Sequence, residues 1–159
     1  LHDALPISFI KEVVKEKKIH TLWFEAHYMY RKKLASFAEQ FAPAKVKFRC
    51  GVETFDTALR EAWKKGIPSS VSVQDIAQHF QGICLLCCTQ GETKEHILKD
   101  IELAKAHFEY FSVNVFCDNH TPIKQDKELA SWFAKEIYPM IKDDPRIEVL
   151  MENTDLGVG

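Results

Sequence analysis

The sequence predicts an α/β protein built on a parallel β-sheet, and three observations lead to this fold class. Short runs rich in β-branched and aromatic residues alternate with stretches in which apolar residues recur at helical spacing. The repeating unit is about thirty residues long, as in strand–helix–strand connections with right-handed crossovers. The run over residues 83–88 is apolar throughout, as expected for a parallel strand that is covered on both faces.

Five strands and five helical segments follow from these patterns. The predicted strands comprise residues 19–25, 46–52, 83–88, 111–117 and 147–151. Apolar residues at helical spacing predict helices over residues 34–41, 59–63, 97–108 and 129–141. A further short helix is predicted over residues 73–80, because Ser72 can act as its N-cap and Asp75 nearly completes a capping box.

The number of units decides between the architectures that a parallel sheet can form. A complete eight-unit barrel needs about 250 residues, and this chain has 159. No Gly-rich phosphate loop follows any predicted strand, which weakens the doubly wound, nucleotide-binding alternative. We therefore expect a TIM-like partial (β/α) barrel, formed as one domain by residues 9–159.

Composition excludes several classes of protein. The chain carries 21 Lys and Arg against 23 Asp and Glu, a net charge of −2, and has no basic block that would predict binding to nucleic acid or an anionic membrane surface. No apolar run approaches the roughly 20 residues of a membrane span. The five cysteines are an odd number and lie mostly in apolar runs, which favours a reducing cytoplasm over a disulfide framework.

The first residues are set apart from this domain. Residues 1–7 are what the triplets CTA CAC GAC GCT CTT CCG ATC encode, and they look like a translated sequencing-library adaptor. We therefore leave residues 1–8 out of the fold, as one would leave out a cloning scar, and expect further protein upstream.

Polar side chains gather where the predicted strands end. Because the carboxyl ends of parallel strands meet at one edge of the sheet, Glu25 and Glu53 should point into the same cleft. His27 and His120 follow two of these strands and are candidate ligands or acid–base groups, although a lone loop histidine is more often merely exposed. For Thr54, Asp56 and Thr93, each of which precedes a predicted helix, capping is the simpler interpretation.

Three motifs in order resemble a known family. Gly51-Val-Glu53-Thr54 followed by Lys64-Lys65-Gly66 resembles the fourth strand and helix of radical S-adenosylmethionine (radical SAM) enzymes. Gly82-Ile-Cys-Leu-Leu-Cys-Cys-Thr-Gln-Gly-Glu-Thr93 resembles their fifth strand, and residues 111–116 with Thr121-Pro122 resemble the sixth strand and its loop. The resemblance implies a C-terminal fragment of a (β/α)6 radical SAM core.

The resemblance, which is closest to the oxygen-independent coproporphyrinogen oxidase branch, also implies roles for five residues. Glu25 corresponds to an acid that hydrogen-bonds the ribose hydroxyls of S-adenosylmethionine (SAM), and Glu53 to a contact with its methionine or sugar end. Lys65 corresponds to a basic residue that pairs with the cofactor's carboxylate, and Arg60 is its rival one helical turn earlier. Cys84 stands where that branch often has an acidic ribose contact.

The cluster ligands of the family are not matched. Its Cys-x3-Cys-x2-Cys motif, which holds a 4Fe–4S cluster, does not occur in the sequence, and we expect it in the upstream part. Cys84 and Cys88 should share one strand face while Cys87 points to the other, so we expect these thiols, like Cys50 and Cys117, to be structural.

The function expected from the resemblance is that of part of a radical SAM enzyme that cleaves SAM reductively to a 5′-deoxyadenosyl radical. Its substrate would be a small molecule or peptide, its reductant a flavodoxin or ferredoxin, and this fragment alone would be inactive. One alternative is a barrel hydrolase or lyase with a divalent metal held by Glu25, His27 and Glu53. Another is a non-catalytic half-barrel that only binds.

Overall fold

Five parallel strands form one sheet, in the order in which they occur along the chain. The structure, a computed structural model, describes residues 6–152, and within them every neighbouring pair of strands is parallel. The strands are β1 (Thr21–Glu25), β2 (Lys45–Glu53), β3 (Gly82–Cys87), β4 (Tyr110–Val115) and β5 (Ile147–Leu150). Each overlaps one of the five predicted strands, with ends that differ by at most two residues.

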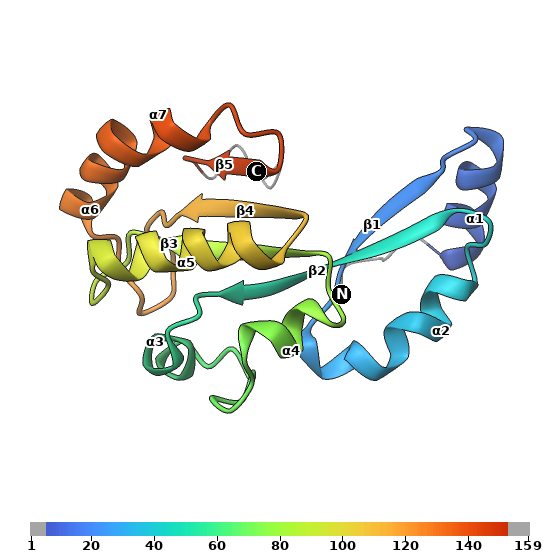
Figure 1. The fold of residues 1–159 in the computed structure, drawn as a ribbon, viewed down its shortest axis with the longest axis horizontal. Coiled ribbons are helices and arrows are strands. Elements are labelled where there is room, and N and C mark those ends of the chain that lie inside the picture. Colours follow the sequence, from blue (N-terminus) through green and yellow to red (C-terminus); the bar gives the residue numbers. More distant parts are fainter. Residues whose placement is uncertain (1–5, 153–159) are drawn as a thin grey trace.

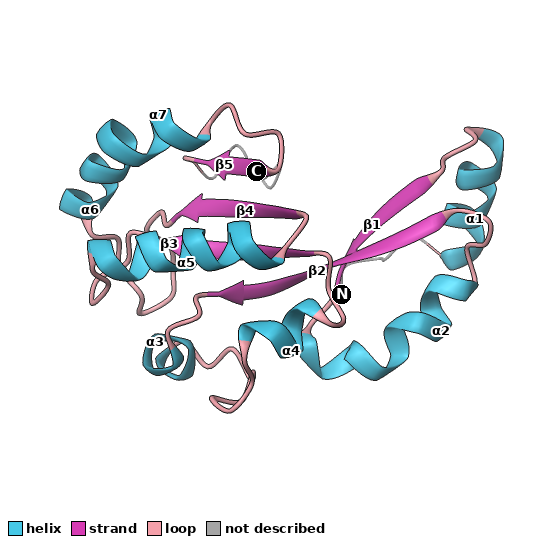
Figure 2. Cartoon of the chain, viewed as in Figure 1, coloured by secondary structure: helices cyan, strands magenta, loops and turns pink. Residues whose placement is uncertain are grey.

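Helices connect the strands and cover one face of the sheet (Figure 2). They are α1 (Ile7–Glu16), a 3-10 helix η1 (Tyr28–Lys33), α2 (Leu34–Glu39), α3 (Thr57–Ala62), α4 (Val73–Ala77), α5 (Lys94–His107), α6 (Lys127–Trp132), a π-helical turn η2 (Phe133–Ile137) and α7 (Tyr138–Ile141). Helix α2 packs on β2, α5 on β3 and β4, and α7 on β5. The sheet curls, so that β1 diverges from β4 and β5 (Figure 1).

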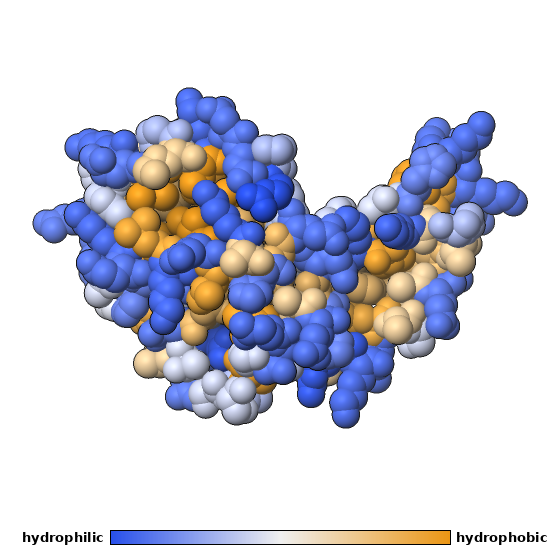
Figure 3. Space-filling model, in the orientation of Figure 1, coloured by the Kyte–Doolittle hydropathy of each residue, from blue (hydrophilic) through white to orange (hydrophobic). Residues whose placement is uncertain are grey.

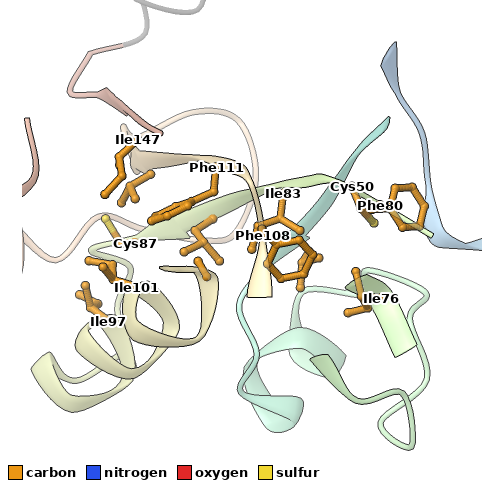
Figure 4. Packing of buried hydrophobic residues seen from close by; sticks show 14 of the residues in the cluster. Cys50, Ile76, Phe80, Ile83, Cys87, Ile97, Ile101, Phe108, Phe111 and Ile147 are labelled. Atoms are coloured by element: carbon orange, nitrogen blue, oxygen red, sulfur yellow. The ribbon is translucent and has the colours of Figure 1, made fainter. Parts of the chain in front are cut away.

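One face of the sheet is apolar, and on the other face the strands apart from β3 place polar side chains. Phe48, Cys50 and Val52 of β2 are buried in the core, and Ile83, Phe111 and Ile147 join them from other strands (Figure 4). The residues between them on β2, Arg49 and Gly51, face the other way. The space-filling view shows the molecule hollowed between the part that carries β1 and the part that carries β4 and β5 (Figure 3).

Three local features differ from the sequence prediction. Helix α1 was not predicted, because it starts inside the adaptor-like stretch; residues 1–5 of that stretch lie outside the described residues. The single helix predicted over residues 129–141 is interrupted by the π-helical turn. The prediction that Cys87 and Cys88 point to opposite faces is wrong: Cys88 has a φ of 66°, which turns the chain and leaves the two sulfurs 3.7 Å apart.

The helix caps agree with the prediction except at Thr54, which is buried before α3 and whose hydroxyl accepts a hydrogen bond from the backbone N–H of the actual cap, Asp56. Ser72 and Asp75 form a complete capping box at the start of α4. Asp56 accepts a hydrogen bond from the backbone of Leu59 and Thr93 accepts one from that of His96, so both cap helices rather than line a site. Within residues 6–152 no helix is long and apolar enough to cross a membrane.

Candidate cofactor-binding site

Three charged side chains converge over Gly51 on the polar face of the sheet. A methyl group at Gly51 would lie 3.4 Å from Oε1 of Glu53, 3.7 Å from Oε1 of Glu25 and 4.0 Å from Nζ of Lys65. Glu25 ends β1 beside Arg49, and Glu53 ends β2 four residues further on, so the two carboxylates come together through their side chains over Gly51. The absent side chain of Gly51 leaves the floor of this group open to a ligand.

Lys65 supplies the positive charge of the group. Its Nζ lies 2.7 Å from Oε1 of Glu53, and their side chains are 29% and 18% exposed. A partly buried pair of this kind is held more firmly than a surface ion pair and keeps an ammonium beside a carboxylate. Lys65 can therefore meet an anionic group of a ligand, while Glu53 can accept hydrogen bonds from a cationic or hydroxyl group.

The backbone at Glu53 is strained, and this strain helps to place its carboxylate beside Lys65. Its φ is 67°, in the left-handed region that residues other than glycine rarely adopt. The register between β2 and β3 shifts between Gly51 and Glu53, so this residue closes the strand at an irregularity. Strain of this kind persists where surrounding structure imposes it, and it clusters at ligand sites.

His27 fixes the loop from which Lys65 extends. Its Nε2 lies 2.7 Å from the carbonyl oxygen of Lys65, and its Nδ1 accepts a hydrogen bond from the backbone N–H of Met29. Because Nδ1 accepts, the proton is on Nε2, which donates to Lys65. The ring also packs against Gly66, whose φ is 65°. Both ring nitrogens of His27 are thus engaged, which removes it from the metal set of the hydrolase alternative.

A cavity of about 330 Å³ adjoins Glu53 and Lys65. It is lined by these two residues and by Trp63, Leu86, Asn114, Val115, Phe116, Cys117, Asn119 and Ile123. Oδ1 of Asn114 is buried and has no hydrogen-bond partner among the described residues. The cavity therefore combines apolar walls with an unsatisfied acceptor, a combination that suits a heteroaromatic ring bearing an amino group.

Cys84 lies on the same face as Gly51. The two residues are paired between β2 and β3, and Cys84 is 7% exposed. Burial raises the pKa of its thiol to about 11. Cys84 is thus a neutral thiol at neutral pH, where the family often has a carboxylate. It borders the predicted site without supplying an anionic contact.

Arg60 is placed elsewhere. Its side chain is 2% exposed, and Nη2 donates hydrogen bonds to the carbonyl oxygens of Pro68 and Val71, at 3.2 and 3.3 Å. It ties α3 to the loop that follows it and does not join Glu25, Glu53 and Lys65. We therefore leave Arg60 out of the proposed site and keep Lys65.

The remaining candidates are structural or exposed. Cys50 and Cys87 are buried in the core, and burial raises the pKa of Cys50 to about 12. Cys117 is half-buried and lies just beyond β4 rather than within it. His120 lies exposed in the loop after β4. In residues 6–152 no three His, Cys, Asp or Glu side chains are grouped closely enough to hold a metal ion.

Sequence reasoning missed two inward-facing residues, Arg49 and Asn114. Both lie within strands and occupy positions whose side chains face the polar side of the sheet. The signal that could have found them is a charged or amide residue inside an otherwise apolar strand, because such a residue needs a partner on the sheet face.

The comparison with solved structures identifies the fold and the family. The chain is similar to a queuine lyase from Clostridium spiroforme bound to SAM and queuine, with a TM-score of 0.89 and 37% identity over 96% of this chain. It spans 66% of the length of that lyase. No protein-family model and no curated protein matches the chain.

This similarity confirms the predicted TIM-like partial barrel and the resemblance stated from the motifs. The identity is well above the level at which only a fold is shared, and the neighbour is a SAM-bound radical SAM enzyme. The chain belongs to the radical SAM enzymes, as the C-terminal part of their core.

Proposed function

We propose that the chain forms the SAM-binding wall of a radical SAM enzyme whose substrate is a small nitrogen heterocycle related to queuine. The observation that carries this proposal is the convergence of Glu25, Glu53 and Lys65 over a residue without a side chain. The bound SAM and queuine of the lyase support it, since 37% of the aligned residues are identical.

The residues present fit SAM. SAM offers a carboxylate, an ammonium, a sulfonium, a ribose diol and an adenine ring. Lys65 matches the carboxylate, Glu53 the ammonium and Glu25 the diol, because carboxylates are strong acceptors and an ammonium is a strong donor. The cavity beside Leu86 and Asn114 offers an apolar slot and a free acceptor for the adenine ring and its amino group.

When bound together with a 4Fe–4S cluster, SAM supplies an electron-driven cleavage that yields a 5′-deoxyadenosyl radical and starts hydrogen abstraction from the substrate. The chain's own residues hold and orient SAM. Lys65 and Glu53 fix the amino-acid end, Glu25 fixes the sugar, and His27 keeps Lys65 in place. The cluster ligands are not matched by any cysteine spacing in this sequence, so we propose that they are supplied from outside it.

Two further points belong to the proposal. The reductant would be a flavodoxin or ferredoxin, which are the one-electron carriers suited to a cluster of low potential. A hydrolase with a divalent metal is disfavoured, because Glu53 is paired with Lys65 and His27 is engaged at both nitrogens.

The proposal is tested with protein expressed from the complete reading frame, reconstituted with iron and sulfide without oxygen. Dithionite and SAM should give 5′-deoxyadenosine and methionine. Lys65→Met should lower the affinity for SAM at least tenfold, and Lys64→Met, one residue earlier and exposed, should not. Formation of neither product, with no binding of SAM measurable by calorimetry, would contradict the proposal.

A further inference from the structure

A second polar group lies on the same face of the sheet, toward the start of β3, β4 and β5. Arg49 lies between two carboxylates: Nη2 is 3.4 Å from Oε2 of Glu25, and Nη1 is 3.6 Å from Oε2 of Glu148. Tyr110 donates a hydrogen bond to the same oxygen of Glu148 at 2.8 Å. The group therefore joins β1, β2, β4 and β5 across the curled sheet.

A cavity of about 350 Å³ opens onto this group. Its lining comprises Trp23, Phe24, Glu25, Arg49 and Tyr110. Glu148 does not line the cavity itself but borders it through its contacts with Arg49 and Tyr110. The rings of Trp23 and Tyr110 lie 5.7 Å apart with a tilt of 48°. Trp23 is 42% exposed, which is unusual for an indole that faces into a curled sheet. The cavity thus has aromatic walls and a charged floor, and its size is in the range of small-molecule sites.

Gly82 explains how Trp23 reaches across the sheet. A methyl group at Gly82 would lie 2.8 Å from the carbonyl oxygen of Tyr110 and 3.0 Å from the Trp23 ring. Only a residue without a side chain lets the indole of β1 lie over β3 and approach Tyr110. The aromatic wall is therefore built into the sheet.

The polar atoms of this group retain free bonding capacity. The contacts of Arg49 with its carboxylates, at 3.4 and 3.6 Å, are longer than the 2.7–2.9 Å of a strong charge-assisted hydrogen bond. A guanidinium has five N–H donors, and the side chain of Arg49 is 31% exposed. Oε1 of Glu148 has no hydrogen-bond partner in the part of the chain that the structure describes, and the side chain is 44% exposed.

The charge of the group selects the ligand. Two carboxylates flank the guanidinium of Arg49, and the nearby Lys47, whose Nζ lies 5.3 Å from the centre of the Trp23 ring, is paired with Glu109. Three carboxylates therefore face two cations, so the surroundings are net negative and disfavour an anionic ligand. Burial and the bond to Glu148 raise the pKa of Tyr110 to about 12, so the phenol stays protonated and Glu148 remains an acceptor. A neutral ring with adjacent N–H donors and a neighbouring carbonyl would satisfy a carboxylate and a guanidinium together.

We propose that Arg49 and Glu148, with the wall of Trp23 and Tyr110, bind the hydrogen-bonding edge of a guanine-type base. Glu148 accepts the ring N–H and the exocyclic amino group, Arg49 donates to the ring carbonyl, and the aromatic rings contact the base's face. The inference rests on the proposed function, in which this base is the substrate. Queuine, a 7-deazaguanine, presents such an edge.

The test compares two bases that differ in one group. 7-Deazaguanine and 7-deazahypoxanthine, which lacks the exocyclic amino group, are titrated by calorimetry into the complete protein in the presence of SAM. The wild type should bind 7-deazaguanine about ten- to hundredfold more tightly, because the missing amino group leaves Glu148 unpaired. Glu148→Gln should remove most of this preference, and Glu102→Gln, the same exchange on the exposed side of α5, should leave it unchanged.

The outcomes separate this inference from the proposed function. The base site would be overturned if the wild type bound the two bases equally, or if a folded Glu148→Gln protein kept the full preference. In either case, binding of SAM would still uphold the proposed function. A base preference that depends on Glu148 in a protein that does not bind SAM would support the base site and overturn the proposed function. If Glu148→Gln does not fold, the wild-type comparison decides alone.

Discussion

The Nε2 of His27 lies 2.7 Å from the carbonyl oxygen of Lys65, so a residue after β1 sets the backbone from which the site's lysine reaches β2. Lys64 and Gly66, on either side of Lys65, both have positive φ values. The N–H groups of Lys64 and Lys65 bond back to the end of α3, and the carbonyl oxygen of Lys65 bonds to His27. The bond to His27 therefore orders the turn and aims the ammonium at Glu53.

The role of His27 can be separated from its helix cap. An asparagine at position 27 can still accept from Met29, as Nδ1 does, but is too short to reach Lys65, whereas a glutamine extends as far as Nε2. We expect His27→Asn to weaken SAM binding about threefold to tenfold, the value of one hydrogen bond, and His27→Gln to weaken it less. Calorimetry on the two variants checks this order, and equal affinities would contradict the positioning role.

Two glycines on the polar face should respond differently to alanine. At Gly51 the added methyl group meets side-chain oxygens at ordinary contact distances of 3.4 and 3.7 Å, so the fold should change in stability by only about 1 kcal/mol. The same methyl group fills the floor of the site, so SAM binding should fall at least tenfold. At Gly82 it would lie 2.8 Å from a backbone oxygen. Gly82→Ala should therefore be strongly destabilised in urea unfolding. A Gly51→Ala protein less stable than Gly82→Ala would contradict these roles of the two glycines.

Arg60 should prove structural. Arg60→Leu removes the donor to the carbonyl oxygens of Pro68 and Val71 and should lower the free energy of unfolding by about 1–3 kcal/mol. The SAM affinity of the folded protein should not change. Chemical denaturation measures the stability and calorimetry the affinity for SAM. A tenfold loss of affinity at unchanged stability would show that Arg60 contributes to the SAM site.

Glu92 should make stability depend on pH. Burial raises its pKa from 4.5 to about 7, although the backbone and side chain of Thr89 donate hydrogen bonds to it. A carboxyl whose pKa is higher in the folded than in the unfolded state favours folding while it is protonated. This stabilisation is full at pH values below the pKa of the unfolded state, and it is lost as the pH rises to the pKa of the folded state. Relative to Glu92→Gln, the wild type should therefore lose up to about 3 kcal/mol between pH 4.5 and pH 8.

The exchange to glutamine removes this titration. Asp100, whose pKa burial also raises, to about 6, is present in both proteins, but its charge also helps to raise the pKa of Glu92, so the difference includes the interaction between the two carboxyl groups. Glu102→Gln, on an exposed part of α5, should show no such trend. A stability difference between wild type and Glu92→Gln that is constant with pH would contradict the raised pKa.

The sequence predicted what depends on local pattern. The strands were found because β-branched and aromatic runs alternate with helical spacing, and Glu25 and Glu53 were placed together because parallel strands end at one edge. The pairing of Arg49 with Glu148 could not be predicted, since it depends on how far the sheet curls. Arg60 was misplaced as a rival of Lys65 because the loop that it binds, residues 68–71, carries no sequence signal.

The binding of SAM to the polar face is the central claim, and isothermal titration of SAM into the wild type and Glu25→Ala tests it most directly. The variant should bind about 1.5–3 kcal/mol more weakly, the contribution of hydrogen bonds to a charged group, with its iron content unchanged. Cys87→Ala, in the core on the other face, should change neither quantity. SAM affinity untouched by Glu25→Ala, with iron lost from Cys87→Ala, would contradict the claim.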